Sequence, residues 1–361
     1  MKLPVVFLLL LSFFCFADAD VEDKLKICFF SPEITTLGIA DWNQPTVDDL
    51  LKLQNFIKER HIRNVKRYSE DPTFQAPFPS DYLNKEFFGW LLYRSGRLSF
   101  IKDEIITPGR QVIYFNNDPN KKDKCVICYA GHQSSWNERD YIRGIHLMIK
   151  ALEQTHFDGH FIYYIGGWPS LKKGRLKYID VPFAFKPFLF EEARDLGYRE
   201  VLWLDACCLP VKSLKPIFKH IRKKGLCFYS YGSLQKWREF DLGYAYLMPF
   251  LNLSKKGRYE QISSQVIGLD LSDAKALCLL NEWIKAAERK IPFLQSDEPP
   301  FMYLINQLQL QNCRMPNNYY IETPCNTGDF NYKRVNRDAI IYHQYDFIDS
   351  QYRVRVNLFS Y

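Results

Sequence analysis

The distribution of apolar and polar residues divides the chain into two unlike parts. In the first part, Thr46–Arg67 has apolar residues at helical spacing after a threonine that can cap the helix, which predicts an amphipathic helix. Lys24–Phe30 is predicted to be a short strand, and Tyr82–Leu92 to be helical. Residues 20–120 are therefore expected to form a mainly helical N-terminal extension.

From residue 124 onward, short apolar runs alternate with amphipathic helical segments, as is typical of an α/β fold. Val201–Leu204 is uninterrupted and apolar, as expected for a strand that helices cover on both faces. The predicted strands are Cys125–Ala130, Gly159–Gly166, Val201–Leu204, Gly225–Ser230, Ser263–Asp270 and Ala339–Gln344. The predicted helices are Asn137–Glu153, Phe188–Leu196, Ile217–Lys224, Pro299–Leu310 and one that follows Asp273 and ends at Ala287.

Asp205 ends the apolar run Val201–Leu204 and is the first candidate site residue. Open α/β sheets bind their ligands beyond the carboxyl ends of the strands, where this carboxylate is expected to lie. A role as a cap of the following turn is the alternative, because aspartate is common in turns.

The sequence around Asp205 resembles a known family. Gly197-Tyr198 is followed by Leu202-Trp203-Leu204-Asp205-Ala206 and then by Pro-x-x-x-Leu-x-Pro-Ile-Phe at residues 210–218. This is similar to the nucleotide-sugar-binding strand of glycosyltransferases with the GT-A fold, which ends in a DxD motif. The resemblance implies a Rossmann-like, mixed and mostly parallel sheet flanked by helices. In this chain the motif reads Asp205-Ala206-Cys207, so the second acid is missing.

The resemblance also implies residues that bind the donor. The loop after the first strand of such enzymes lies over the nucleotide, which makes His132, Ser134 and Arg139 candidates for nucleotide contacts. Lys186 opens a helix whose dipole and cation could meet a diphosphate. A polar connection and an exposed lysine are the alternatives.

Asp297 and His343 complete the implied site. Asp297 precedes a helix and is the candidate to orient or deprotonate an acceptor hydroxyl, with helix capping as the alternative. His343 ends a predicted strand and, with Asp205, is the candidate ligand pair for Mn²⁺ or Mg²⁺. A thiolate is a poor ligand for these ions, so Cys207 is not expected to replace the missing acid. A site that relies on Lys186 without a metal, and a site that has lost activity, stay open.

The function implied by the resemblance is transfer of a sugar from a nucleotide-diphosphate donor to a hydroxyl of a glycan or protein acceptor, assisted by a divalent cation. The alternative is an exported carbohydrate-binding or host-interacting protein on an inactive transferase scaffold. A serine hydrolase is not supported, because the chain has no GxSxG motif.

Charge and cysteines narrow the function further. The formal net charge of +7 over 361 residues occurs in short clusters without a nucleic-acid motif, so no nucleic acid is expected as a partner. Cys125 and Cys128 form a CxxC pair inside a predicted strand, with no second CxxC and no paired histidines. They are therefore predicted to be buried core thiols.

The N-terminus predicts export. Lys2 is followed by an apolar run over residues 3–16 and then by Ala17-Asp18-Ala19, the pattern of a signal peptide that is cut after Ala19. The protein is thus expected in the secretory route. The alternative is that residues 3–16 stay and anchor it in a membrane. The predicted organisation is a signal peptide (1–19), an extension (20–120) and a GT-A-like domain (121–361).

Overall fold

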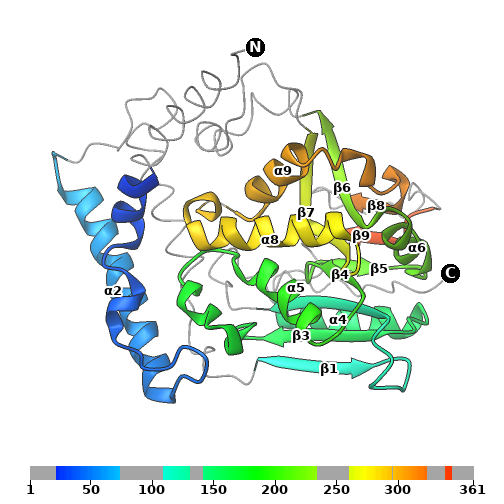
Figure 1. The fold of residues 1–361 in the computed structure, drawn as a ribbon, viewed down its shortest axis with the longest axis horizontal. Helices are drawn as coiled ribbons and strands as arrows, with labels where there is room; N and C mark the ends of the chain where they lie inside the picture. The colour runs from blue at the N-terminus through cyan, green and yellow to red at the C-terminus, as the bar shows by residue number, and fades with distance from the viewer. Residues whose placement is uncertain are drawn as a thin grey trace, which may run out of the picture.

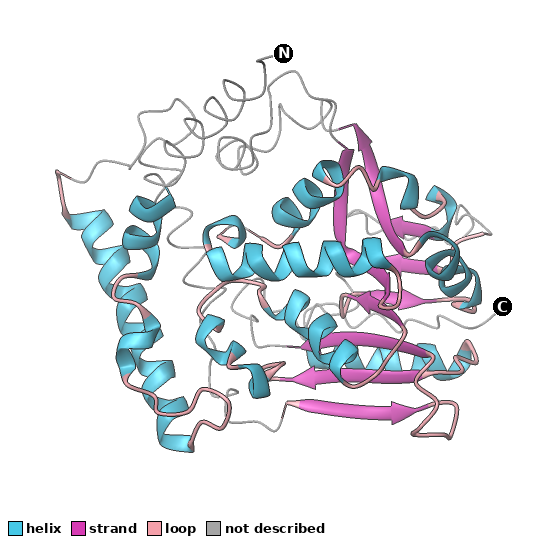
Figure 2. Ribbon diagram, viewed as in Figure 1, coloured by secondary structure: helices cyan, strands magenta, loops and turns pink. Residues whose placement is uncertain are grey.

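A computed structural model describes residues 22–73, 109–130, 141–233, 260–294, 296–322 and 338–343. Its centre is a six-stranded sheet in the order β1-β3-β2-β4-β7-β6 (Figures 1 and 2). The strands are β1 (Arg110–Tyr114), β2 (Lys124–Ala130), β3 (His160–Ile165), β4 (Glu200–Leu204), β6 (Leu226–Ser233) and β7 (Glu260–Asp270).

The sheet is mixed. β2 pairs in parallel with both β3 and β4, whereas β1 is antiparallel to β3. β7 is antiparallel to both β4 and β6, so β6 runs in the same direction as β2, β3 and β4. The predicted mixed, mostly parallel sheet is confirmed. β1 lies before residue 121, yet it hydrogen-bonds to β3 and belongs to this sheet.

Helices cover both faces of the sheet (Figure 2). The alternation along β4 sends Val201 and Trp203 into one apolar cluster, and Leu202 and Leu204 into the other. The first cluster includes α5 (Phe185–Asp195), α8 (Ala274–Arg289) and α9 (Glu298–Gln307), and the second includes α4 (Tyr141–Gln154) and α6 (Lys215–Lys224). β4 is thus buried on both sides, as its apolar run predicts.

Among the described residues, two α-helices precede the sheet. α2 (Val47–Glu70) begins with a capping box in which Thr46 and Asp49 bond each other's backbone N–H, which confirms the predicted helix and its cap. The predicted strand at Lys24–Phe30 is wrong, because residues 22–30 are helical. Leu25 and Phe29, four residues apart, bury one helical face. The segment Tyr82–Leu92 lies outside the described residues.

A second, three-stranded sheet brings the C-terminal part of the chain to the end of β4. Its order is β5 (Cys208–Pro210), β9 (Ile341–His343) and β8 (Tyr320–Glu322). β9 is antiparallel to β5 and places His343 opposite Cys208. Among the described residues, no helix is both long enough and apolar enough to cross a bilayer.

Candidate functional site

Asp205 lies at the carboxyl end of β4, as its sequence position predicts. Its backbone N–H donates to the carbonyl of Gln265 at 3.0 Å, and its carbonyl accepts from the N–H of Cys208 at 2.7 Å. These bonds anchor it to β7 and close the turn into β5. The Asp205 side chain is 26% exposed and thus only partly buried at this end of the sheet.

Lys186 comes to Asp205 from α5. This helix starts at Phe185, so Lys186 lies in its first turn, and the predicted start at Phe188 is one turn too late. The Lys186 Nζ atom lies 3.0 Å from Asp205 Oδ1 and 2.6 Å from Asp297 Oδ2, and it donates to the carbonyl of Ser264 at 2.9 Å. We call these four residues the Lys186 cluster.

The surroundings of Lys186 differ from those expected of a residue that grips a phosphate. Its side chain is only 3% exposed, and three oxygen atoms surround an ammonium group that has three N–H donors. Its ammonium group already contacts two carboxylate oxygens and one carbonyl oxygen. Lys186 instead fixes two carboxylates relative to each other.

Trp203 completes the support of Asp205. Its indole Nε1–H donates to Asp205 Oδ1 at 2.7 Å, and its ring centroid lies 4.9 Å from the Lys186 ammonium. The sequence analysis did not select Trp203. Residues two apart at the end of a strand point to the same side, so the spacing of Trp203 and Asp205 contained the signal.

The electrostatics of the cluster follow from burial and charge. Burial, together with the charge of Asp297, raises the pKa of Asp205 above its ordinary value, although Lys186 and the Trp203 hydrogen bond act against this. Burial alone lowers the pKa of Lys186, but the charges of Asp205 and Asp297 outweigh it, and the net pKa is raised. Lys186 therefore stays charged at neutral pH.

Asp297 precedes α9, where the sequence left a choice between a site residue and a helix cap. It occupies the N-cap position, but its side chain makes no capping hydrogen bond. The side chain of Ser296 accepts from the N–H of Glu298 at 3.1 Å instead. The Asp297 carboxylate, 5% exposed, pairs with Lys186.

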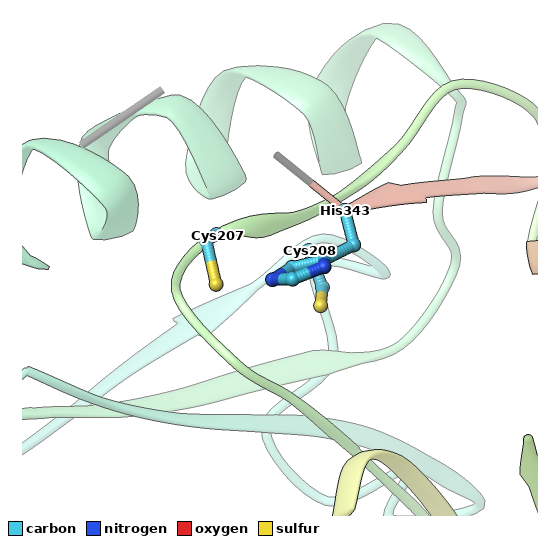
Figure 3. Close-up of side chains that lie close together, drawn as sticks. All are labelled: Cys207, Cys208 and His343. Atoms are coloured by element: carbon cyan, nitrogen blue, oxygen red, sulfur yellow. The ribbon is translucent and has the colours of Figure 1, made fainter. Parts of the chain in front are cut away.

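His343 lies beside two cysteines. Ligand atoms of Cys207, Cys208 and His343 all lie within 4.8 Å of one another, and all three residues are buried (Figure 3). A hydrogen bond from Cys208 and the neighbouring His343 lower the pKa of Cys207 to about 6, against burial and the charge of Asp205. Burial raises the pKa of Cys208 well above its usual value.

This donor set does not fit the predicted Mn²⁺ or Mg²⁺ site. Those ions prefer oxygen ligands, whereas the group around His343 offers two sulfur atoms and one imidazole and contains no carboxylate. Asp205 Oδ1 is already in contact with Lys186 and Trp203. Among the described residues, Asp205 and His343 are thus parts of two neighbouring groups with different chemistry.

The remaining predicted contacts cannot be placed. His132, Ser134 and Arg139 lie outside the described residues. Cys125 and Cys128 are buried free thiols in β2, as predicted.

The chain was compared with known proteins. No protein-family model and no curated protein sequence matches it. It is similar to solved structures of three glycosyltransferases. One is the galactosyltransferase LgtC in complex with donor and acceptor sugar analogs, with 13% identity over 61% of this chain and 86% of that one and a TM-score of 0.35. Another is the bifunctional glycosyltransferase WbbM, with 13% identity over 63% of this chain and 46% of that one and a TM-score of 0.37. The third is mouse xyloside xylosyltransferase 1, with 9% identity over 62% of this chain and 97% of that one and a TM-score of 0.37.

Proposed function

We propose that this protein is a glycosyltransferase that moves a sugar from a nucleotide-diphosphate donor to an acceptor hydroxyl. The observation that carries the proposal is the Lys186 cluster. Lys186, Asp205 and Asp297 come from three distant segments, and each is a site residue predicted from the sequence. They meet at the carboxyl end of β4, where α/β proteins bind ligands.

Asp205 is the residue proposed to touch the donor, because it is the exposed member of the cluster. Lys186 and Trp203 hold its Oδ1 atom, so the carboxylate has a fixed direction before a ligand arrives. A fixed carboxylate is suited to accept hydrogen bonds from sugar or ribose hydroxyls.

The charge of the cluster suits the transfer step. As the bond between the anomeric carbon and the diphosphate breaks, positive charge develops on the sugar ring. Two ionised carboxylates and one ammonium leave one net negative charge, which stabilises that transition state electrostatically. The acceptor hydroxyl forms the new bond to the anomeric carbon and passes its proton to a phosphate oxygen of the leaving nucleoside diphosphate, which departs with the electron pair of the broken bond.

Lys186 and Asp297 are positioning residues in this proposal. Asp297 was predicted to orient or deprotonate the acceptor, a role that requires hydrogen-bond reach of that hydroxyl. Its burial and its contact with Lys186 favour an indirect role, in which it keeps Lys186 charged and Asp205 in place. Export of the protein, and hence work in a secretory lumen, stays a prediction from the N-terminal sequence.

A second function has one observation in its favour. Cys207 stands where the second acid of the DxD motif is expected, and the described residues do not form a site for Mn²⁺ or Mg²⁺. An exported carbohydrate-binding or host-interacting protein on an inactive transferase scaffold would explain that loss.

A turnover assay distinguishes a glycosyltransferase from a carbohydrate-binding protein. The full chain is incubated with UDP- and GDP-sugars and mixed glycan acceptors, and release of nucleoside diphosphate is measured. A transferase releases UDP or GDP, and Asp205→Asn, which keeps the shape but removes the charge, lowers kcat by about 100-fold. Asp273→Asn, which changes the same residue type at the N-cap of α8, leaves kcat unchanged. Glycan binding without release of either nucleotide would favour the binding protein.

A further inference from the structure

The turn after β4 brings two adjacent cysteine side chains together. Consecutive residues of a strand point to opposite faces, which would separate the sulfur atoms of Cys207 and Cys208. Only Cys208 belongs to β5, however, while Cys207 lies in the turn that the bond from Cys208 N–H to the Asp205 carbonyl closes. The turn thus allows the sulfur atoms of Cys207 and Cys208 to lie close to each other.

The antiparallel pairing of β5 with β9 supplies a third ligand. It places His343 directly opposite Cys208. Side chains opposite each other in an antiparallel pair are close neighbours, so the register holds the imidazole beside the thiol. Figure 3 shows the His343 ring between the two sulfur atoms in that view. Backbone hydrogen bonds thus hold both parts of the group: the turn bond to Asp205 holds the two cysteines, and the pairing of β5 with β9 holds His343.

We propose that Cys207, Cys208 and His343 form a binding site for Zn²⁺. Two sulfur atoms and one imidazole nitrogen suit a borderline-soft ion and not Mn²⁺ or Mg²⁺. Zinc takes such ligands in tetrahedral sites, and two cysteines with one histidine leave the fourth position for water.

The distances are compatible with this ion. The ligand atoms lie within 4.8 Å of one another, and a tetrahedral zinc ion at ordinary bond lengths needs sulfur and nitrogen atoms about 3.5–3.8 Å apart. Side-chain movement on the order of 1 Å closes the group around the ion. Both cysteines are free thiols in the structure, so no disulfide has to be broken.

Other thiols of the chain provide the control. Cys227 in β6 is also a fully buried free thiol, but it lies outside the group. If zinc were bound by any buried cysteine, Cys227→Ser would lower zinc binding as much as Cys207→Ser does. If the group binds it, only changes at Cys207, Cys208 or His343 lower it.

The test is metal content and spectroscopy of the reduced full chain. After loading with Zn²⁺ and dialysis, elemental analysis is expected to find about one zinc per chain in the wild type and in Cys227→Ser. Cys207→Ser and His343→Ala are expected to bind zinc roughly tenfold or more weakly. Co²⁺ in place of zinc should give the thiolate charge-transfer band in the near ultraviolet, and Cys207→Ser should lose most of it.

A measurement without variants guards against misfolded mutants. Because an ion that binds only the folded state stabilises it, adding Zn²⁺ to chelator-treated wild type should raise its Tm. Reduced wild-type protein that takes up no zinc and shows no change in Tm would overturn the proposal, and so would equal zinc loss in Cys227→Ser. Neither readout needs a nucleotide sugar, so the zinc site can hold where the proposed transferase activity fails, and the reverse.

Discussion

Two of the buried ionic clusters among the described residues, around Arg60 and around Lys186, differ in their surroundings. Arg60 of α2 bonds to Asp180 at 2.8 Å and to the backbone carbonyls of Phe30 and Pro32, and both charged side chains are almost fully buried. Lys186 contacts two carboxylates, and the side chain of one of them, Asp205, is 26% exposed.

This difference separates a structural cluster from a candidate site. Arg60 donates to the carbonyl of Phe30, the last residue of the helix at residues 22–30, and to that of Pro32 just after it, so it ties the N-terminal helices to Asp180 of the α/β domain. The Lys186 cluster has a partly exposed carboxylate, that of Asp205, at the carboxyl end of β4. Buried ion pairs contribute little net stability in general, so burial alone does not separate the two clusters, whereas the partial exposure of Asp205 does.

Lys186→Met is expected to have the largest effect. It leaves two carboxylates without their cation, and loss of one partner from a buried pair costs about 3–5 kcal/mol of unfolding free energy. Urea denaturation measures the loss, and nucleotide release should disappear as well. Lys186→Met combined with Asp297→Asn should recover part of the stability but none of the turnover. A single variant as stable and active as the wild type would contradict the role of the cluster.

Arg60→Met is expected to cost somewhat less, about 2–4 kcal/mol, because Lys290 lies 3.8 Å from Asp180 and partly compensates its charge. Turnover per folded molecule should stay unchanged. Lys66→Ala is the control on the same helix, since its exposed pair with Glu70 contributes about 0–1 kcal/mol. Lost turnover in a stable Arg60→Met protein would break the distinction between the two clusters.

Asp273→Ala is expected to cost about 1 kcal/mol, because Asp273 caps α8 by accepting from the N–H groups of Lys275 and Ala276. Its effect should appear in urea denaturation only. Weaker donor binding in this variant would mean that general destabilisation, and not the Lys186 cluster, controls binding.

The smallest expected effect is a pH dependence. The raised pKa of Asp205 means that the folded protein keeps this proton to higher pH than the unfolded chain does. Unfolding free energy therefore falls as the pH rises from the ordinary aspartate value to the raised one. Asp205→Asn should flatten this part of the curve of urea midpoint against pH. A curve of unchanged slope in the variant would show that burial of Asp205 is not the cause.

The sequence predicted local features well. The apolar run of β4, the alternation after residue 124 and the Thr46 cap depend on neighbours along the chain. Asp205 could be selected because it ends a buried strand. The helix at residues 22–30 was missed, because Leu25 and Phe29 fit a short apolar strand as readily as one helical face.

The contacts within the site required tertiary structure. Lys186 donates to the backbone carbonyl of Ser264 in β7. Every residue has such a carbonyl, so the sequence gives no signal for this contact. The approach of Cys207 to His343 depends on a turn and on the register of two short strands far apart in the sequence. From the sequence, Asp205 and His343 were predicted to bind one metal ion together, because the resemblance implied Mn²⁺ or Mg²⁺ and these ions accept oxygen and nitrogen ligands.

Calorimetric titration of the full chain with UDP and GDP tests the central claim, that the Lys186 cluster forms a nucleotide-sugar site through its member Asp205. The account predicts that the wild type binds one of the two nucleotides in the micromolar range. It also predicts that Asp205→Ala weakens this binding by about tenfold or more, a loss of about 1.4 kcal/mol or greater, and that Asp273→Ala binds as the wild type does. Absence of binding to both nucleotides, or equal affinity in Asp205→Ala, would contradict the account.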